Sequence, residues 1–320
     1  MTDGAGNLVH VLAVLSVLFA LLHIYHIFDL IWLYFLRPSS VKRYLHGTAP
    51  YAIVTGATDG IGKATAAELL MRGFSVILHG RNEAKMQKVV KELRASAKGK
   101  ASTADIRYFI ANASKDRHDW AKLLEPLGEL HVTVVVHNVS GEPLIDTRID
   151  ERTEEYLLGV VHSNALFALF LTRALLPQLR RAAQSGPVQV LFVGSFAGDV
   201  GPPRLPMCAA SKGFLRALAR GLDNDELFFG VPTGVRFAYL AVGAVHSDNH
   251  PAPMPPSLAV PTSARFAWWL VESIGCGRRR FAPYLVHAMQ WLMQMSGDRA
   301  VDQGMAQRMQ ELMMEAEKGK

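Results

Sequence analysis

A glycine-rich turn, residues 55–62, constrains the fold of this chain more than any other segment. Its sequence is TGATDGIG, and it lies between the apolar run 52–55 and a helical pattern over 60–72. Glycines in such a turn permit a sharp change of direction and let a pyrophosphate approach the N-terminus of the helix closely. The order strand, turn, helix predicts a dinucleotide-binding unit, and a purely structural turn is the alternative. The residues that we assign to cofactor binding here are Gly56, Thr58, Asp59, Gly60, Ile61 and Gly62.

Short runs rich in apolar and β-branched residues follow the turn, separated by amphipathic segments. The runs do not alternate in polarity, which is typical of strands buried on both faces of a parallel sheet. We therefore predict an α/β fold with a doubly wound, Rossmann-like parallel sheet. The predicted strands are 52–55, 74–79, 106–111, 132–137, 188–194 and 235–240, and the predicted helices are 60–72, 83–98, 116–127, 153–182, 208–228 and 263–274.

The N-terminal segment departs from the composition of a soluble domain. Residues 8–36 contain no lysine or arginine, and Asp29 is their only formally charged residue. The segment is long enough to span a bilayer. Because the start carries Asp3, no basic residue and no obvious cleavage site, we predict an uncleaved single-pass anchor over 1–36 rather than a secretory signal. The alternatives are a shorter span followed by an interfacial turn around Trp32, or a hairpin buried on the globular domain.

Basic residues gather beside apolar stretches, at 37–43 and 278–280, in a chain of formal net charge +6. This placement suits anionic lipid rather than DNA, so we expect a membrane partner and no nucleic acid. By the positive-inside tendency, the first cluster places the downstream part in the cytosol. We divide the rest of the chain into a basic linker 37–49, a dinucleotide-binding domain 50–262 and a helical extension 263–320 that faces membrane or substrate.

The two cysteines, Cys208 and Cys276, form no disulfide framework and have no metal-ligand spacing. We expect a reducing compartment and no metal site.

The glycine spacing, four and then two, resembles that of the short-chain dehydrogenase/reductase family rather than the GxGxxG form. Later motifs extend the resemblance: Asn164 lies 13 residues before Pro177, Ser195 lies 13 residues before position 208, and Lys212 lies four residues after it. The resemblance implies that Ser195 hydrogen-bonds a substrate carbonyl, that Lys212 contacts the nicotinamide ribose, and that Asn164 supports a proton-relay water. Positions 208 and 212 share one helix face.

The family keeps its catalytic tyrosine four residues before the lysine, where this chain has Cys208. The phenol donates a proton as hydride arrives, and a positioned acid contributes on the order of 10² to 10⁴ in rate. Cysteine has a suitable pKa, which Lys212 is expected to lower. The sulfur stops short of a phenolic oxygen, so donation requires a shifted substrate or a bridging water. A third possibility is a nucleophilic thiolate, although residues 201–212 contain no histidine partner.

Further cofactor contacts follow the strands. The end of the second predicted strand lacks the acidic residue that would bind the ribose 2′-hydroxyl of NAD, and Arg81 lies there instead. Its planar cation suits a 2′-phosphate, so we predict NADP(H) rather than NAD. An exposed arginine at a helix start is the alternative. The resemblance also assigns Asn112 near the adenine, Asn138 as the second asparagine of the family's Asn-Asn-Ala-Gly, and Val245 in the motif after the sixth strand.

The anchor, the basic linker, TGATDGIGKA, Arg81-Asn82 and a C-terminal IGCGR followed by Pro283-Tyr284 together resemble one branch of the family. It is the membrane-bound very-long-chain 3-oxoacyl-CoA reductase and 17β-hydroxysteroid dehydrogenase type 12 branch. The resemblance implies the endoplasmic reticulum membrane, fatty acid elongation, and a lipid-like ketone substrate, either a long-chain 3-oxoacyl-CoA or a steroid.

Two further properties stay open at this point. The branch includes members with a replaced tyrosine, so the alternative to an NADPH-dependent reductase is an inactive NADP-binding pseudoenzyme that scaffolds a lipid-synthesis complex. A homodimer is a further possible assembly. Residues 281–295 suit a helix that lies on a membrane or lines a hydrophobic tunnel, and ordinary packing explains them equally well.

Overall fold

The computed structural model describes residues 2–97, 103–142, 146–247, 255–276, 280–281 and 284–318. The chain divides into two units, Met1–Pro38 and Ser39–Lys320. Arg278 and Arg279 of the second basic cluster, and Pro283, lie outside the described residues.

The first unit is one long helix, α1 (Thr2–Ile31), which continues into a π-helical turn, η1 (Trp32–Leu36). Most of its apolar side chains from residue 8 onward are exposed. By length and composition, Gly6–Leu36 can cross a membrane. A second stretch, Glu154–Ala183, passes the same test but is partly buried in the second unit, as a core helix of a globular domain is. The apolar N-terminal helix predicted from the sequence is therefore present.

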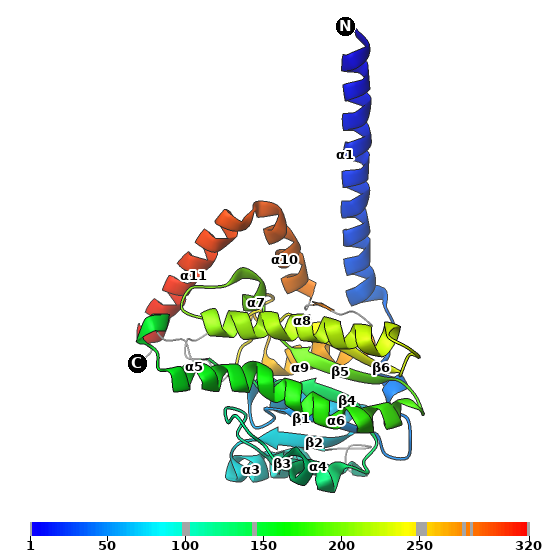
Figure 1. The fold of residues 1–320 in the computed structure, drawn as a ribbon, viewed down its shortest axis with the longest axis vertical. Coiled ribbons are helices and arrows are strands. Elements are labelled where there is room, and N and C mark those ends of the chain that lie inside the picture. Colours follow the sequence, from blue (N-terminus) through cyan, green and yellow to red (C-terminus); the bar gives the residue numbers. More distant parts are fainter. Residues whose placement is uncertain are drawn as a thin grey trace. The chain divides into compact units, whose positions relative to one another are not determined.

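The second unit is built on a parallel sheet (Figure 1). In the described part of the chain its strand order is β3-β2-β1-β4-β5-β6-β7. The order reverses between β1 and β4, and such a switch point opens a crevice beyond the carboxyl ends of the strands. The first six strands confirm the predicted runs, whereas the two-residue β7 beside β6 was not predicted. The bounds are β1 Tyr51–Thr55, β2 Ser75–Gly80, β3 Ile106–Ile110, β4 Val132–His137, β5 Val188–Val193, β6 Val235–Leu240 and β7 Arg280–Phe281.

Helices cover both faces of this sheet, which confirms the doubly wound fold. One face packs against α2 (Gly60–Arg72), α3 (Glu83–Ser96) and α9 (Ser263–Glu272). The other packs against α4 (Trp120–Leu124), α6 (Phe167–Ala183) and α8 (Pro206–Phe228), and Figure 1 shows α6 and α8 lying across it. Alternate strand residues enter the two cores, so both faces of each central strand are apolar.

Two predicted helices differ from the observed ones. The helix predicted from 116 begins at Trp120, because the Asp119 side chain caps it by accepting from Lys122 N, and Pro126 then tightens its end into a 3-10 turn, η4 (Glu125–Leu127). The helix predicted over 153–182 is interrupted. It consists of α5 (Glu154–Val161), a π-helical turn η6 (His162–Leu166) and α6.

Within the second unit, the linker residues after Pro38 and the C-terminal extension pack on the core of the domain. A 3-10 turn, η2 (Val41–Tyr44), buries its first and last residues, and Tyr44 O accepts a hydrogen bond from Thr133 Oγ1 at 2.8 Å. The extension contains α10 (Tyr284–Ser296) and α11 (Asp298–Lys318). Gln290 Nε2 donates to Asp199 Oδ2 at 2.7 Å, which fastens α10 to the short helix α7 (Ala197–Val200).

Candidate functional site

A cleft of about 510 Å³ opens at the carboxyl ends of the strands on either side of the switch point. Its lining includes many of the residues that we assigned to cofactor binding, namely Gly56, Thr58, Asp59, Gly60, Arg81, Asn112 and Asn138. Ile61 and Val245 instead pack in the core beneath one face of the sheet. Ser247, two residues beyond Val245, reaches the lining in its place.

The turn between β1 and α2 depends on its glycines. Gly56 and Gly60 have φ values of 66° and 49°, in the left-handed region that side chains disfavour. A Cβ atom on Gly62 would lie 2.2 Å from the Gly56 carbonyl oxygen, so only glycine lets the helix approach the turn this closely. The Asp59 side chain caps α2 by accepting from Gly60 N at 2.7 Å. The N-terminus of α2 therefore meets the cleft, where its dipole favours an anion.

Residues that the sequence did not single out hold this turn against the neighbouring strands. Thr55 Oγ1 accepts from the backbone N–H groups of Asn138 and Val139, at 2.9 and 3.1 Å. Gly56 N donates to His79 Nδ1 at 3.4 Å, which leaves Nε2 of that ring to donate to Ala111 O at 3.1 Å. Burial lowers the pKa of His79 to about 4. The neutral ring thus acts as a fixed spacer at the end of β2.

The two polar residues predicted for the adenosine end lie at the rim. Arg81 is exposed at the end of β2, just before Asn82, whose side chain caps α3 by accepting from Lys85 N. Asn112 Oδ1 accepts from Ser114 N at 3.2 Å and from its Oγ at 2.9 Å. Both predicted residues line the cleft.

Ser195 lies just beyond the end of β5, and Tyr239 of β6 holds its backbone. The phenol donates to Ser195 O and accepts from Ser195 N, each at 3.0 Å. A Cβ atom on Gly194 would lie 2.0 Å from the Tyr239 ring, so glycine is required before the serine. Ser195 Oγ accepts from Ala197 N at 3.1 Å, so the position of the hydroxyl is set as well.

Helix α8 carries Cys208 in its first turn and Lys212 one turn later. Lys212 is 2% exposed, and its Nζ donates to Val193 O at 3.0 Å, two residues before Ser195. Burial lowers the pKa of this amine to about 8. Burial raises the pKa of the Cys208 thiol; Lys212 lowers it and Glu142 raises it. The lowering effect of Lys212 agrees with the prediction from the sequence, but burial outweighs it, so the net shift of the thiol pKa is upward.

Asn164 lies at the centre of the π-helical turn η6, which packs against α8. Its side chain is fully buried, and Oδ1 accepts from Gly141 N at 2.9 Å. Its Nδ2 is a buried donor with no hydrogen-bond partner among the described residues. Such π-helical turns are frequent at functional sites, and a buried donor without a partner suits a water molecule or a ligand.

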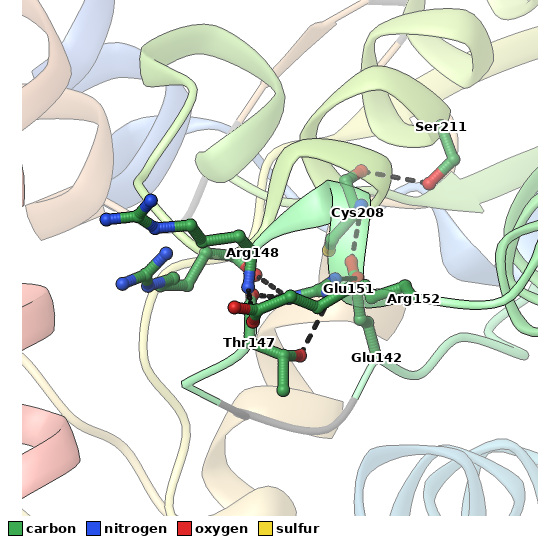
Figure 2. Close-up of polar contacts among 8 residues, drawn as sticks. Glu142, Thr147, Arg148, Glu151, Arg152, Cys208 and Ser211 are labelled. Carbon is green, nitrogen blue, oxygen red and sulfur yellow. Dashed lines mark hydrogen bonds and ion pairs between the residues drawn. The ribbon is translucent and has the colours of Figure 1, made fainter.

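Glu142, in the loop after β4, contacts the start of α8 (Figure 2). Its Oε2 accepts from Cys208 N at 2.7 Å, and its Oε1 pairs with Arg152. The sequence offered no sign of either residue, because one carboxylate in a loop and one arginine before a helix are common surface features.

The comparisons identify the family. A model of the short chain dehydrogenase family matches residues 50–252. The chain belongs to the short-chain dehydrogenase family. A very-long-chain 3-oxoacyl-CoA reductase of Schizosaccharomyces pombe is 34% identical over 239 residues, covering 73% of this chain and 67% of that protein. One of Kluyveromyces lactis is 30% identical over 266 residues, covering 80% of this chain and 74% of that protein.

Solved structures of other dehydrogenases share the fold. A short-chain dehydrogenase from Sphingobium yanoikuyae in complex with NADPH has a TM-score of 0.63 and 19% identity, covering 79% of this chain and 94% of that chain. An alcohol dehydrogenase from Thermococcus sibiricus, complexed with 5-hydroxy-NADP, has a TM-score of 0.61 and 23% identity, covering 73% of this chain and 96% of that chain. At these identities the likeness shows the fold alone.

The burial of Lys212 predicts an unusual pH dependence of stability. In the unfolded chain the amine keeps its proton up to pH 10.5, whereas in the folded protein it releases it near pH 8. Between these values the unfolded state binds more protons, so rising pH stabilises the fold. We expect the free energy of unfolding of the native protein, relative to Lys212→Met, to rise by about 3 kcal/mol between pH 7.5 and 10.5. Urea unfolding at several pH values measures it, and a difference independent of pH would contradict it.

Proposed function

We propose that the protein is a membrane-anchored, NADPH-dependent reductase that converts the ketone of a long-chain 3-oxoacyl-CoA into an alcohol. The observation that carries the proposal is the placement of Lys212, whose Nζ donates to Val193 O, two residues before Ser195, and whose charge acts on the Cys208 thiol. The same domain carries a glycine-lined cleft at the carboxyl ends of its strands. The substrate class comes from the relatives named as very-long-chain 3-oxoacyl-CoA reductases.

The cleft fits a nicotinamide dinucleotide. The Gly56 carbonyl oxygen lies where a Cβ atom on Gly62 would be, so the turn is packed tightly against the start of α2. The N-terminus of this helix favours binding of the pyrophosphate. Arg81 would bind a 2′-phosphate, and Asn138 would line the inner wall. When bound, the cofactor supplies the hydride that reduces the carbonyl carbon. The protein's own groups orient that carbonyl and deliver the proton that its oxygen takes up.

In this proposal Ser195 hydrogen-bonds the substrate carbonyl, and its held backbone keeps the hydroxyl in place. Two groups can supply the proton. The Cys208 thiol stays protonated at neutral pH because burial raises its pKa, and Lys212 has a pKa of about 8. An acid with a pKa near the working pH transfers protons efficiently. The free Nδ2 of Asn164 would hold a water that refills this path from solvent.

The membrane assignment rests on the first unit. Gly6–Leu36 is long and apolar enough to span a bilayer, and its side chains are exposed. Arg37, Lys42 and Arg43 follow it, so the positive-inside tendency places the reductase domain in the cytosol. The elongation of fatty acids at the endoplasmic reticulum membrane is the setting that we infer.

Charge reversal at Arg81 tests the choice of cofactor. We expect Arg81→Glu to weaken NADPH binding about 10- to 100-fold, because it loses a charge-assisted contact to the 2′-phosphate, while NADH binding changes little. Isothermal titration with each nucleotide measures this. Arg173→Glu is the matched control, since Arg173 is exposed on α6 and does not line the cleft. Equal loss of NADPH and NADH affinity would contradict the assignment.

Turnover tests the chemistry. The full chain is assayed for NADPH oxidation with a long-chain 3-oxoacyl-CoA, and a steroid ketone is the comparison substrate. We expect native turnover, its loss in Lys212→Ala, and a gain of up to about 10²-fold in Cys208→Tyr, because a phenol reaches further than a thiol. Activity that appears only in Cys208→Tyr would mean an intact site that lacks its acid. No turnover in either protein, with NADPH still bound, would refute the reductase and leave a cofactor-binding scaffold.

Removal of the N-terminal unit tests the anchor. We expect the full chain to stay with membranes through alkaline carbonate extraction, and a chain lacking residues 2–36 to be released. The truncated chain keeps the apolar stretch Glu154–Ala183, but that stretch is partly buried in the domain, whereas Gly6–Leu36 is not buried. Protease treatment of sealed microsomes should digest the reductase domain from the cytosolic side. A full chain released by carbonate, or a domain protected from protease, would contradict the anchor or its orientation respectively.

A further inference from the structure

A fully buried ion pair lies beside position 208 (Figure 2). The side chains of Glu142 and Arg152 are 0% and 2% exposed. Their attraction offsets the cost of leaving water only when further hydrogen bonds satisfy both groups. The partners of these bonds therefore indicate which parts of the chain the pair holds together.

Each member of the pair holds a different segment. Glu142 Oε2 accepts from Cys208 N at 2.7 Å, in the first turn of α8. Arg152 Nη2 donates to Arg204 O at 2.6 Å and to Thr147 O at 3.1 Å, and its Nε donates to Thr147 Oγ1 at 3.3 Å. The pair thus joins the loop after β4, the start of α5, the segment before α8 and the helix that carries Cys208.

The segment before α8 is held in a strained conformation. Arg204 has a φ of 66°, and within the described ranges it is the one residue other than glycine with a positive φ. This conformation is uncommon for a long side chain and persists where surrounding contacts enforce it. Here the hydrogen bond from Arg152 and an ion pair between Arg204 and Asp146 at 2.7 Å enforce it. Strain of this kind gathers at functional sites.

We propose that Glu142, held by Arg152, is a positioning residue that fixes the start of α8 and so presents the side chain at position 208 to the substrate carbonyl. The proposal rests on the reductase function proposed above. Glu142 does not itself deliver the proton, because one carboxylate oxygen pairs with Arg152 and the other accepts from Cys208 N. The cysteine side chain is short, so a small displacement of the first turn of α8 would move the thiol too far from the substrate carbonyl for proton transfer.

The charge of Glu142 adds to this role. Among the described residues, the charged groups that act on the Cys208 thiol are Lys212, from the same helix, and Glu142, from the loop after β4. Lys212 favours the thiolate, whereas burial and Glu142 favour the thiol. The carboxylate therefore helps to keep at position 208 a group that still carries its proton.

Glu142→Gln tests the proposal, since it keeps the shape and an acceptor oxygen and removes the charge. The pH profile of Cys208 alkylation by iodoacetamide, followed by mass spectrometry of the modified peptide, should move about one unit to lower pH. The kcat should fall about tenfold or more, with the KM for NADPH unchanged, because Glu142 itself does not line the cofactor cleft. Alkylation requires no turnover, so it reports on Glu142 even in a protein that fails as a reductase.

Asp223→Asn is the matched control. Asp223 is fully buried, pairs with Arg236 at 2.8 Å and accepts from Phe237 N at 3.0 Å, so it is built like Glu142 but joins a later part of α8 to β6. Both variants should lower the thermal midpoint by about 10 °C. Only Glu142→Gln should move the alkylation profile. A Glu142→Gln protein that loses thermal stability but keeps the native profile and kcat would overturn the proposal.

Arg152→Lys keeps the proposal testable if Glu142→Gln does not fold. Lysine retains the positive charge but lacks the planar fork that reaches Arg204 and Thr147 together. The kcat should fall at least severalfold while the alkylation profile stays in place, because the charge of Glu142 is unchanged. A native kcat in a folded Arg152→Lys protein would overturn the positioning role.

Discussion

The burial of the Lys212 amine is the constraint on which the candidate site depends. A cation removed from water is costly unless it is hydrogen-bonded or loses its proton, and Lys212 shows both responses. It donates to the Val193 carbonyl at the end of β5, and its pKa falls to about 8. That hydrogen bond fixes α8 against the strand that leads to Ser195. The helix is thereby aligned with the carboxyl edge of the sheet, where the glycine-lined cleft opens.

Near this lysine, buried polar groups occupy positions that are apolar in an ordinary hydrophobic core. The Nδ2 of Asn164 is buried without a partner in the described part of the chain, and the Glu142–Arg152 pair is removed from water. Each arrangement lowers stability relative to a well-packed apolar alternative. Their concentration along α8 and the helix packed against it is typical of a site where the chemistry sets the residues.

The sheet and the glycine turn were predictable because each follows from local pattern. Strands buried on both faces show no alternation of polar and apolar residues. Position 62 must be glycine because the Gly56 carbonyl oxygen lies where a Cβ atom would be. The π-helical turn around Asn164 was not predictable, because the helical pattern runs through it unbroken. Glu142 was missed because its importance comes from Arg152 and Cys208, which lie 10 and 66 positions away in the sequence. The lowering effect of Lys212 on the thiol pKa was predictable, but the net rise was not, because burial outweighs that charge and the sequence does not show burial.

The surroundings of position 208 favour a proton donor over a nucleophile. A nucleophilic cysteine needs a lowered pKa and a base, whereas burial and Glu142 raise the pKa of this thiol. Lys212 opposes them, but burial also lowers the pKa of Lys212 to about 8, so desolvation disfavours the charged form of both groups. Near neutral pH the thiol and the amine therefore both carry protons, one helix turn apart. In the proposed reductase, these two groups would supply the proton that the reduced carbonyl oxygen takes up.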